Sequence, residues 1–307
     1  MRFAYITHPD CIRHEMGPHH PECPDRVTAI HERLRVEGLL DFAASYEAPA
    51  ATIEQLSRAH TRAHVLELQA QAPLHGYSAI DPDTSMNPHT WTAALHAAGA
   101  AVLATELIKS ASAPRVFCTV RPPGHHATRT AAMGFCFFNN VVVGIRHALD
   151  ALEFERVALI DFDVHHGNGS EDIVAGDARI LMLSTFQSPL YPYSGEHPSA
   201  DNLVSVPLAP YTDGAALRTA VLDRWQPALE RFQPQVLFIS AGFDAHRDDD
   251  ISQLRWRDED YAWITRELVA VANRHAAGRV VSMLEGGYAI PALARSVERH
   301  VRELMDL

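Results

Sequence analysis

Short apolar runs alternate with longer amphipathic stretches along nearly all of the 307-residue chain. The runs are rich in Val, Ile, Leu and Phe without regular polar alternation, which is typical of strands covered on both faces. The predicted strands span residues 2–6, 115–120, 156–160, 179–184, 235–240 and 279–284. The predicted helices span residues 25–37, 90–109, 139–152, 213–232, 258–276 and 291–305. This alternation predicts an α/β fold with a mostly parallel sheet between helices.

The chain is expected to form one domain, spanning residues 1–307. It contains no internal repeat, no low-complexity segment and no Gly/Ser-rich linker. Its longest irregular stretches, residues 8–24, 74–89 and 186–201, are interpreted as loops rather than domain boundaries. An α/β domain of this length is common.

The charge and the termini limit the partners and the compartment. The formal net charge is −12, which argues against direct nucleic-acid binding, because such proteins present a basic face. No run of 18 apolar residues predicts a membrane span, and the first seven residues lack a signal-peptide pattern. The four cysteines form no CxxC pair. We therefore expect a cytoplasmic protein that does not bind a membrane; no sequence feature indicates its oligomeric state.

Chemically active residues follow four of the predicted strands. In a parallel sheet, ligands bind beyond the carboxyl ends of the strands, so these residues should converge at one edge. The residues at these strand ends are His125 and His126, then Asp161 to Asn168, then Asp244, and finally Tyr288.

Asp163, His165 and Asp244 are the candidate metal ligands. In an extended chain, residues two apart point the same way, so Asp161, Asp163 and His165 would share a face. With Asp244 from another strand end, Asp163 and His165 would leave one position open for water, as in catalytic zinc sites. An oxygen-rich set of this kind could also hold Fe2+ or Co2+. The alternative is a polar strand end that makes only loop hydrogen bonds.

Beside a metal, an imidazole is a natural proton shuttle. This makes His125 and His126 candidates, with Asp161 and Asn168 as possible partners of their far ring nitrogens. Tyr288 could donate a hydrogen bond to a developing oxyanion. The alternatives are solvated histidines and a half-buried structural tyrosine.

Two other polar patterns are interpreted as having no functional role. His60 and His64 stand four residues apart on a probable helix, without an acidic partner, and are interpreted as surface residues. The acidic run at residues 248–250 is interpreted as a solvated loop. No Gly-x-Ser-x-Gly motif is present, which argues against a serine hydrolase.

Several ordered motifs resemble those of the histone deacetylase superfamily, in particular its class II-like bacterial amidohydrolases. They are HPECPDR at residues 20–26, RPPGHH at 121–126, GFCFFNN at 134–140, DFDVHHGNG at 161–169, AGFD at 241–244 and LEGGY at 284–288. The resemblance spans essentially the whole chain. It implies the arginase–deacetylase fold, a three-layer α/β/α structure with an eight-stranded, mostly parallel sheet.

The resemblance implies a role for each residue at these motifs. Zinc would be held by Asp163, His165 and Asp244. His125 would be paired with Asp161, His126 would be the general base and acid oriented by Asn168, and Tyr288 would stabilise the oxyanion.

The resemblance also implies supporting sites. Gly134 and Phe135 would form the substrate channel, with Tyr191 opposite Phe135 across an acyl-lysine stem. Arg26 would line an internal product-release path. Asp161 and Ser184 would contribute to a structural K+ site.

The implied activity is metal-dependent removal of acetyl or other short acyl groups from the Nε of lysine, by attack of a metal-bound water. Acetylpolyamine-specific members carry a glutamate seven residues after the last metal-binding aspartate. Here that position is Ile251, which favours an acyl-lysine peptide or protein. Because Asp249 or Asp250 could bend inward, an acetylpolyamine amidohydrolase remains the alternative. An arginase-like or other small-amide hydrolase and an inactive acyl-lysine reader are further alternatives.

Overall fold

The computed structural model describes residues 3–307 and contains a central sheet of eight strands in the order β2-β1-β5-β10-β9-β6-β7-β8. Every neighbouring pair in this sheet is parallel, as the apolar runs predicted. The predicted strand at 2–6 begins at Arg2, which lies outside the described residues. The strands are β1 Phe3–Thr7, β2 Ala43–Glu47, β5 Arg115–Cys118, β6 Val157–Asp161, β7 Ile180–Gln187, β8 Leu203–Leu208, β9 Val236–Ala241 and β10 Val280–Leu284.

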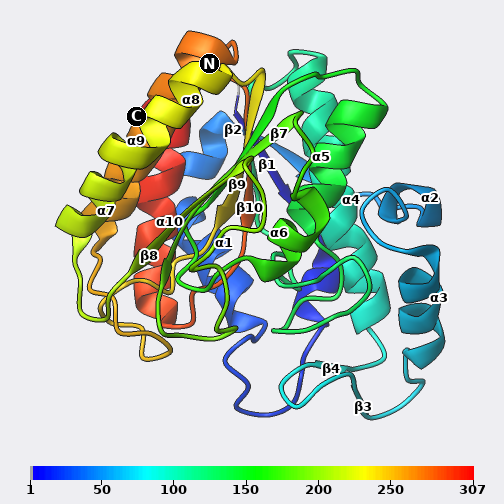
Figure 1. Cartoon of the computed structure of the whole chain (residues 1–307). Coiled ribbons are helices and arrows are strands. Elements are labelled where there is room, and N and C mark those ends of the chain that lie inside the picture. Colours follow the sequence, from blue (N-terminus) through cyan, green and yellow to red (C-terminus); the bar gives the residue numbers. More distant parts are fainter. Residues whose placement is uncertain (1–2) are drawn as a thin grey trace.

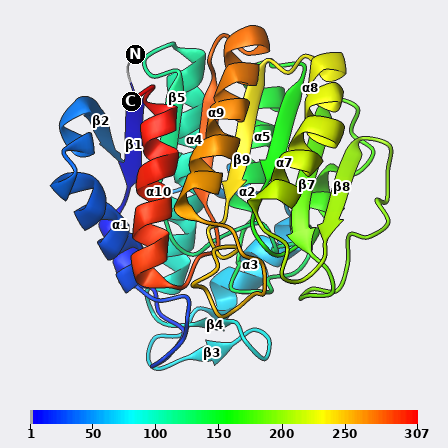
Figure 2. The same ribbon diagram turned by 90° about the vertical axis from the view of Figure 1, so that its left-hand side faces the viewer.

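Helices cover both faces of the sheet (Figure 1). The helices α1, α7, α8, α9 and α10 pack on one face, and Figure 2 shows α10, α9 and the successive helices α7 and α8 in front of the strands. The other face is covered mainly by α4 and α5. The helices are α1 Asp25–Val36, α2 Ile53–Leu56, α3 Arg62–Gln71, α4 Thr90–Lys109, α5 Asn140–Asp150, α6 Asn168–Val174, α7 Gly214–Ala220, α8 Gln226–Phe232, α9 Asp258–His275 and α10 Ile290–Leu304, with short turns η1 Pro9–Ile12, η2 Leu39–Phe42 and the π-helical η3 Val221–Trp225.

The central strands are apolar because both of their faces are buried. All five residues of β6 and all five of β10 are buried, which accounts for their continuous hydrophobic character. Two further strands, β2 and β8, lie at the two edges and were not predicted. A small antiparallel pair, β3 Ser78–Ala79 and β4 Ser85–Met86, lies within the loop predicted at 74–89.

The last strand in the sequence lies in the middle of the sheet. β10 pairs with β5 on one side and with β9 on the other, so it joins one group of strands, β2-β1-β5, to the other, β9-β6-β7-β8. Since all strands are parallel, their carboxyl ends meet at one edge, where four of the central strands β5, β10, β9 and β6 stand next to one another.

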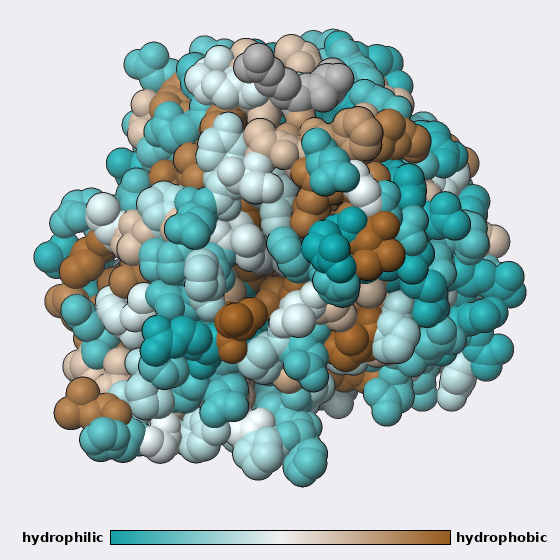
Figure 3. Space-filling view, turned by 180° about the vertical axis from the view of Figure 1, so that it is seen from behind, coloured by the Kyte–Doolittle hydropathy of each residue, from teal (hydrophilic) through white to brown (hydrophobic). Residues whose placement is uncertain are grey.

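The long helix α4 is apolar enough to cross a membrane by length and composition alone, yet 67% of its apolar window is buried inside the molecule. It packs against β5 and α5 as a core helix does. Seen from behind, the molecular surface is mostly hydrophilic, with hydrophobic groups interspersed (Figure 3).

Candidate active site

Three buried side chains converge at the carboxyl edge of the sheet. Asp163 and His165 follow β6, which ends at Asp161, and Asp244 follows the neighbouring β9. One ligand atom from each lies within 4.8 Å of the others. His165 Nδ1 is 3.0 Å from Asp163 Oδ1 and 3.2 Å from Asp244 Oδ2. The sequence-predicted metal ligands are therefore brought together.

Backbone donors fix both carboxylates. Asp163 accepts hydrogen bonds from the N–H groups of His165 (2.9 Å) and Gly286 (2.8 Å). Asp244 Oδ1 accepts from Val164 N–H at 3.0 Å. Its Oδ2 is buried and has no hydrogen-bond partner among residues 3–307. A buried carboxylate oxygen without a hydrogen bond is unfavourable, and a divalent cation bound between these side chains would satisfy it. The donor set, one imidazole and two carboxylates, fits zinc.

Two histidines lie beside this cluster, each with a partner on its far nitrogen. His125 Nδ1 is 3.0 Å from Asp161 Oδ2, and His126 Nδ1 is 2.7 Å from Asn168 Oδ1. The Asn168 amide nitrogen donates to Met133 Sδ, which leaves its oxygen to face His126. Because an amide oxygen only accepts, His126 carries its proton on Nδ1 and a lone pair on Nε2.

The two histidines differ electrostatically. Burial alone would lower the pKa of His125, but the carboxylates of Asp163 and Asp161 raise it to about 10. Burial lowers the pKa of His126 well below its usual value, and the neighbouring His125 and His165 rings act in the same direction. His126 is therefore the neutral imidazole, able to accept a proton.

Tyr288 follows β10, and the Asp249 side chain holds its backbone. The N–H groups of Tyr288 and Ala289 donate to Asp249 Oδ2 at 2.6 and 2.9 Å. The Arg26 guanidinium lies 4.9 Å from the centre of the Tyr288 ring. Burial raises the pKa of the Tyr288 hydroxyl well above its usual value, so the hydroxyl keeps its proton and can donate it in a hydrogen bond.

A cavity of about 210 Å³ is lined by His126, His165 and Tyr288. Phe135 and Tyr191 both line it, although the Phe135 ring contacts Tyr288 edge-on, with ring centres 6.0 Å apart. Gly134 packs so closely that an added Cβ would lie 2.6 Å from His126 Cδ2. The complete lining is Asp83, His126, Gly134, Phe135, His165, Leu190, Tyr191, Ile251 and Tyr288.

Comparison with known proteins decides the family. A model described as a histone deacetylase domain matches residues 20–304. The chain belongs to the histone deacetylase family. The histone deacetylase-like amidohydrolase of Pseudomonas aeruginosa is 33% identical over 94% of this chain and 82% of its own. Polyamine deacetylase HDAC10 of Mus musculus is 32% identical over 92% of this chain and 45% of its own.

The fold of this family member agrees with that assignment. The crystal structure of the HDA15 HD domain superposes with a TM-score of 0.93 at 29% identity, over 99% of this chain and 88% of the other. The predicted α/β fold of the arginase–deacetylase type is confirmed. The predicted reaction class, that of a deacetylase or amidohydrolase, is confirmed at the level of the family.

Arg26 lies in a buried ionic network outside the cavity lining. It donates to the Gly287 carbonyl at 2.7 Å and to Glu22, which also accepts from Arg121. Burial alone would raise the pKa of Glu22, but the Arg121 guanidinium holds it well below its usual range. Arg26 is completely buried and is not part of the cavity lining, so its role in product release stays a prediction.

Asp161 and Ser184 lie opposite each other on the paired strands β6 and β7. Asp161 Oδ1 accepts from Asp163 N–H, and its Oδ2 faces His125. The Ser184 hydroxyl is buried without a hydrogen-bond partner among residues 3–307. This unpaired oxygen fits a cation ligand, and the K+ site itself stays a prediction.

The structure corrects the interpretation of His60 and His64 as surface residues. Both are buried, at 2% and 5% exposure. His60 lies before α3, bonding the Thr128 carbonyl with Nδ1 and accepting from Asn139 N–H with Nε2. His64 Nε2 donates to the Phe137 carbonyl. They fasten the loop that carries the active-site histidines, a long-range contact that spacing alone could not reveal.

The acidic run at 248–250 is likewise only partly solvated. Asp249 is buried, whereas Asp248 and Asp250 are exposed. Sequence reasoning also missed Glu285, a buried carboxylate that accepts from the N–H groups of Gly124 (2.7 Å) and His125 (3.1 Å). Burial raises the pKa of Glu285 to about 7. Asp249 and Glu285 hold the loops that carry the candidate residues Tyr288 and His125 through backbone hydrogen bonds.

Proposed function

We propose that this protein is a zinc-dependent amidohydrolase that removes acetyl or other short acyl groups from the Nε of lysine. One observation carries the proposal: His165, from the buried cluster that it forms with Asp163 and Asp244, lines the same cavity as His126 and Tyr288. This arrangement supplies a cation site, a base and a hydrogen-bond donor to one substrate amide.

The three clustered side chains would hold zinc, with Fe2+ or Co2+ as alternative metals. A bound divalent ion would polarise the amide carbonyl and make water more acidic. His126 Nε2 takes the proton of the attacking water and returns it to the leaving amine. Tyr288 donates its hydroxyl hydrogen bond to the carbonyl oxygen as negative charge develops there. His125 and Asn168 position these groups. Asp161 and Ser184 would bind K+.

The cavity lining favours a lysine side chain. Phe135, Tyr191, Leu190 and Ile251 present apolar surface to the four-carbon stem, which is apolar until its end. At Gly134 an added Cβ would come too close to the His126 ring, so this position requires glycine.

Acetylated polyamines are the second candidate substrates. Asp83 lines the same cavity and could attract a second ammonium group. A relative named polyamine deacetylase supports this candidate. Ile251 opposes it, because its apolar side chain stands on the lining where the acetylpolyamine-specific branch carries a glutamate.

Steady-state turnover of the zinc-loaded enzyme tests the proposal. We expect a higher kcat/KM for an acetyl-lysine peptide than for N-acetylputrescine. Tyr288→Phe should lower kcat by about 10²-fold while zinc content stays unchanged. As a specificity control, Ile251→Glu should raise the relative kcat/KM for N-acetylputrescine. Faster turnover of the polyamine by the unmodified enzyme would favour the second candidate, and no acetate release from either substrate would contradict both.

A further inference from the structure

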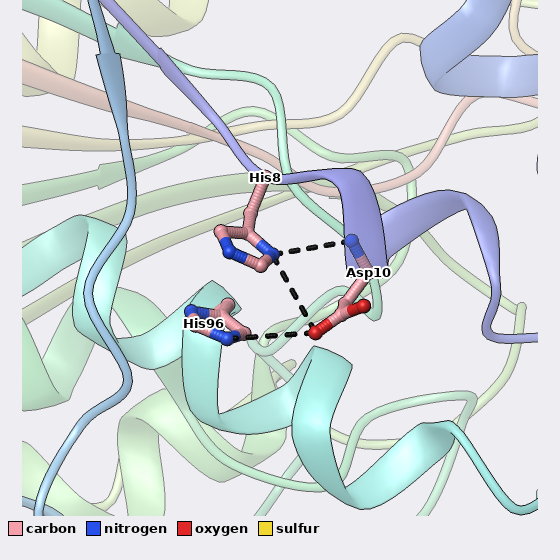
Figure 4. A group of neighbouring side chains, drawn as sticks. All are labelled: His8, Asp10 and His96. Carbon is pink, nitrogen blue, oxygen red and sulfur yellow. Dashed lines mark hydrogen bonds and ion pairs between the residues drawn. The ribbon is translucent and has the colours of Figure 1, made fainter.

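His8 and His96 form a pair of histidines away from the catalytic cavity. His8 Nδ1 accepts from the Asp10 N–H at 3.1 Å, and the two imidazole rings stack with their centres 3.4 Å apart and a 9° interplanar angle (Figure 4). Because the lone pair of an imidazole nitrogen lies in the plane of the ring, stacked rings do not direct their lone pairs at one ion. We interpret this pair as a structural contact between the segment after β1 and α4.

His166 is a second buried histidine that the proposed mechanism does not use. It follows the candidate metal ligand His165 and is 2% exposed. Its Nε2 lies 3.0 Å from Glu171 Oε2, and its Nδ1 lies 2.9 Å from the Ser194 hydroxyl oxygen. Because a carboxylate only accepts, Nε2 carries a proton and donates it to Glu171. His166 therefore joins α6, which contains Glu171, to the loop that contains Ser194.

This loop, residues 188–199, forms one wall of the catalytic cavity and is called the wall loop below. It supplies two of the lining residues, Leu190 and Tyr191. The Tyr191 ring meets the His126 ring edge-on, with ring centres 5.2 Å apart. The position of the wall loop therefore determines where the cavity wall stands relative to the proposed base.

Few hydrogen bonds hold the wall loop in place. Among residues 3–307, the single hydrogen bond that residues 190–198 make outside the loop is the one between Ser194 and His166. At the end of the loop, Ser199 donates to Glu171 Oε1 through its hydroxyl group at 2.7 Å. Ser194, His166, Glu171 and Ser199 thus form one continuous chain of hydrogen bonds, which fastens both the tip and the end of the loop to α6.

The His166 ring also packs tightly against the loop. Gly195 has a φ of +89°, and an added Cβ there would lie 2.4 Å from His166 Cδ2. Both the backbone conformation and this close approach require glycine. Phe186, in β7, contacts the same ring with ring centres 4.8 Å apart. The imidazole is therefore a fixed point against which the loop is placed.

We propose that His166 is a positioning residue that makes the cavity selective for substrates with a long apolar stem, by holding the wall loop in place. This inference rests on the proposed function and deepens it. His166 is not part of the cavity lining, so it acts through Tyr191 and Leu190. Without its hydrogen bond the loop tip is free to move, and binding the stem must then also order the wall.

Steady-state kinetics of Ser194→Ala tests the selectivity. Ser194 is exposed, so removal of its hydroxyl group leaves the core intact. We expect KM for an acetyl-lysine peptide to rise about tenfold while kcat falls less than about threefold. Zinc content and the inhibition constant of acetohydroxamate, a small zinc ligand without a stem, should stay unchanged. Ser194→Thr keeps the hydroxyl group and should restore KM, whereas His166→Ala should reproduce the effect of Ser194→Ala.

Hydrogen exchange of the backbone amides at residues 188–199 tests the link without activity. Exchange should be faster in Ser194→Ala than in the unmodified chain, because local opening of the loop costs less. His197→Ala is the matched control, since His197 is exposed in the same loop and makes no hydrogen bond among residues 3–307. It should alter neither exchange nor KM.

Three results would overturn the proposal. Unchanged exchange in Ser194→Ala would show that His166 does not hold the loop. Faster exchange with an unchanged KM would show that the held loop does not govern selectivity. An equal loss of peptide turnover and of acetohydroxamate binding would show a general structural effect. If the unmodified enzyme releases no acetate, the proposed function fails and the selectivity role with it, whereas the exchange measurement still decides whether His166 holds the loop.

Discussion

Asp249 shows how a residue outside the reacting groups can control one of them. Its Oδ2 accepts from two consecutive N–H groups, those of Tyr288 and Ala289, and its Oδ1 accepts from Ile251 N–H. The side chain is 4% exposed. It therefore holds both the Tyr288 backbone and the Ile251 segment of the cavity wall.

We predict that Asp249→Asn lowers kcat by about ten- to a hundredfold with unchanged zinc content. An amide has one oxygen, so its NH2 group would face either the Ile251 N–H or the N–H groups of Tyr288 and Ala289. Either clash shifts the loops that Asp249 ties together and with them Tyr288, and small misplacements of reacting groups are costly. Steady-state kinetics provides the measurement.

A double variant distinguishes positioning from a general structural effect. In the Tyr288→Phe background, Asp249→Asn should lower kcat little further, because the hydroxyl that it positions is already gone. Additive losses would contradict this role. Asp250→Asn, at the exposed neighbouring position, should leave kcat unchanged.

The sequence predicted most of the candidate site because its chemistry follows strand ends. His125, Asp163, Asp244 and Tyr288 each stand just beyond an apolar run, so the parallel sheet alone brings them to one edge. Asp249 stands inside a polar loop, where a buried acidic residue and its exposed neighbours have the same local pattern. Only the path of the loop distinguishes them.

At the scale of single elements, α1 illustrates how burial decides stability. Ile30 is completely buried between the helix and the sheet, whereas Val36 on the same helix is 64% exposed. Both are β-branched and intrinsically similar in a helix.

We predict that Ile30→Ala lowers the free energy of unfolding by about 2–5 kcal/mol, because it removes buried methyl groups and leaves a cavity. Val36→Ala should change it by no more than about 0.5 kcal/mol. Denaturant unfolding followed by circular dichroism measures both. Equal losses in the two variants would show that burial of Ile30 against the sheet is not the source of its contribution to the free energy of unfolding.

The elements that sequence reasoning missed are those with weak apolar signals. The edge strand β2 is exposed or half-buried throughout, and only the two end residues of β8, Leu203 and Leu208, are buried. Hydrogen bonds to β1 and β7 make them strands. The predicted helix at 213–232 is real but contains the π-helical turn η3, a local change that apolar periodicity does not report.

At the scale of the whole molecule, buried histidines link stability to pH. Burial lowers the pKa of His60 and of His300 to about 3. Unfolding restores a pKa near 6.5, so the unfolded chain binds more protons below that value. The stability contributed by these neutral histidines is present above pH 6.5 and is lost as the pH falls toward 3.

We predict that protonation of each of these histidines in the unfolded chain lowers the free energy of unfolding by about 1.4 kcal/mol as the pH falls from 7.5 to 5.5. His300→Asn should remove this amount from the pH dependence, whatever its effect on absolute stability. Guanidinium unfolding at the two pH values measures the difference. A His300→Asn variant whose stability depends on pH as strongly as that of the unmodified chain would refute the assignment.

The central place of β10 has a consequence for biosynthesis. A nascent chain that stops before Val280 holds His125 and His126 on one half-sheet and the candidate zinc ligands on the other, with no strand to join them. Ribosomes make chains from the amino terminus, so the two histidines and the candidate zinc ligands come to one edge of a continuous sheet only after β10 has been made.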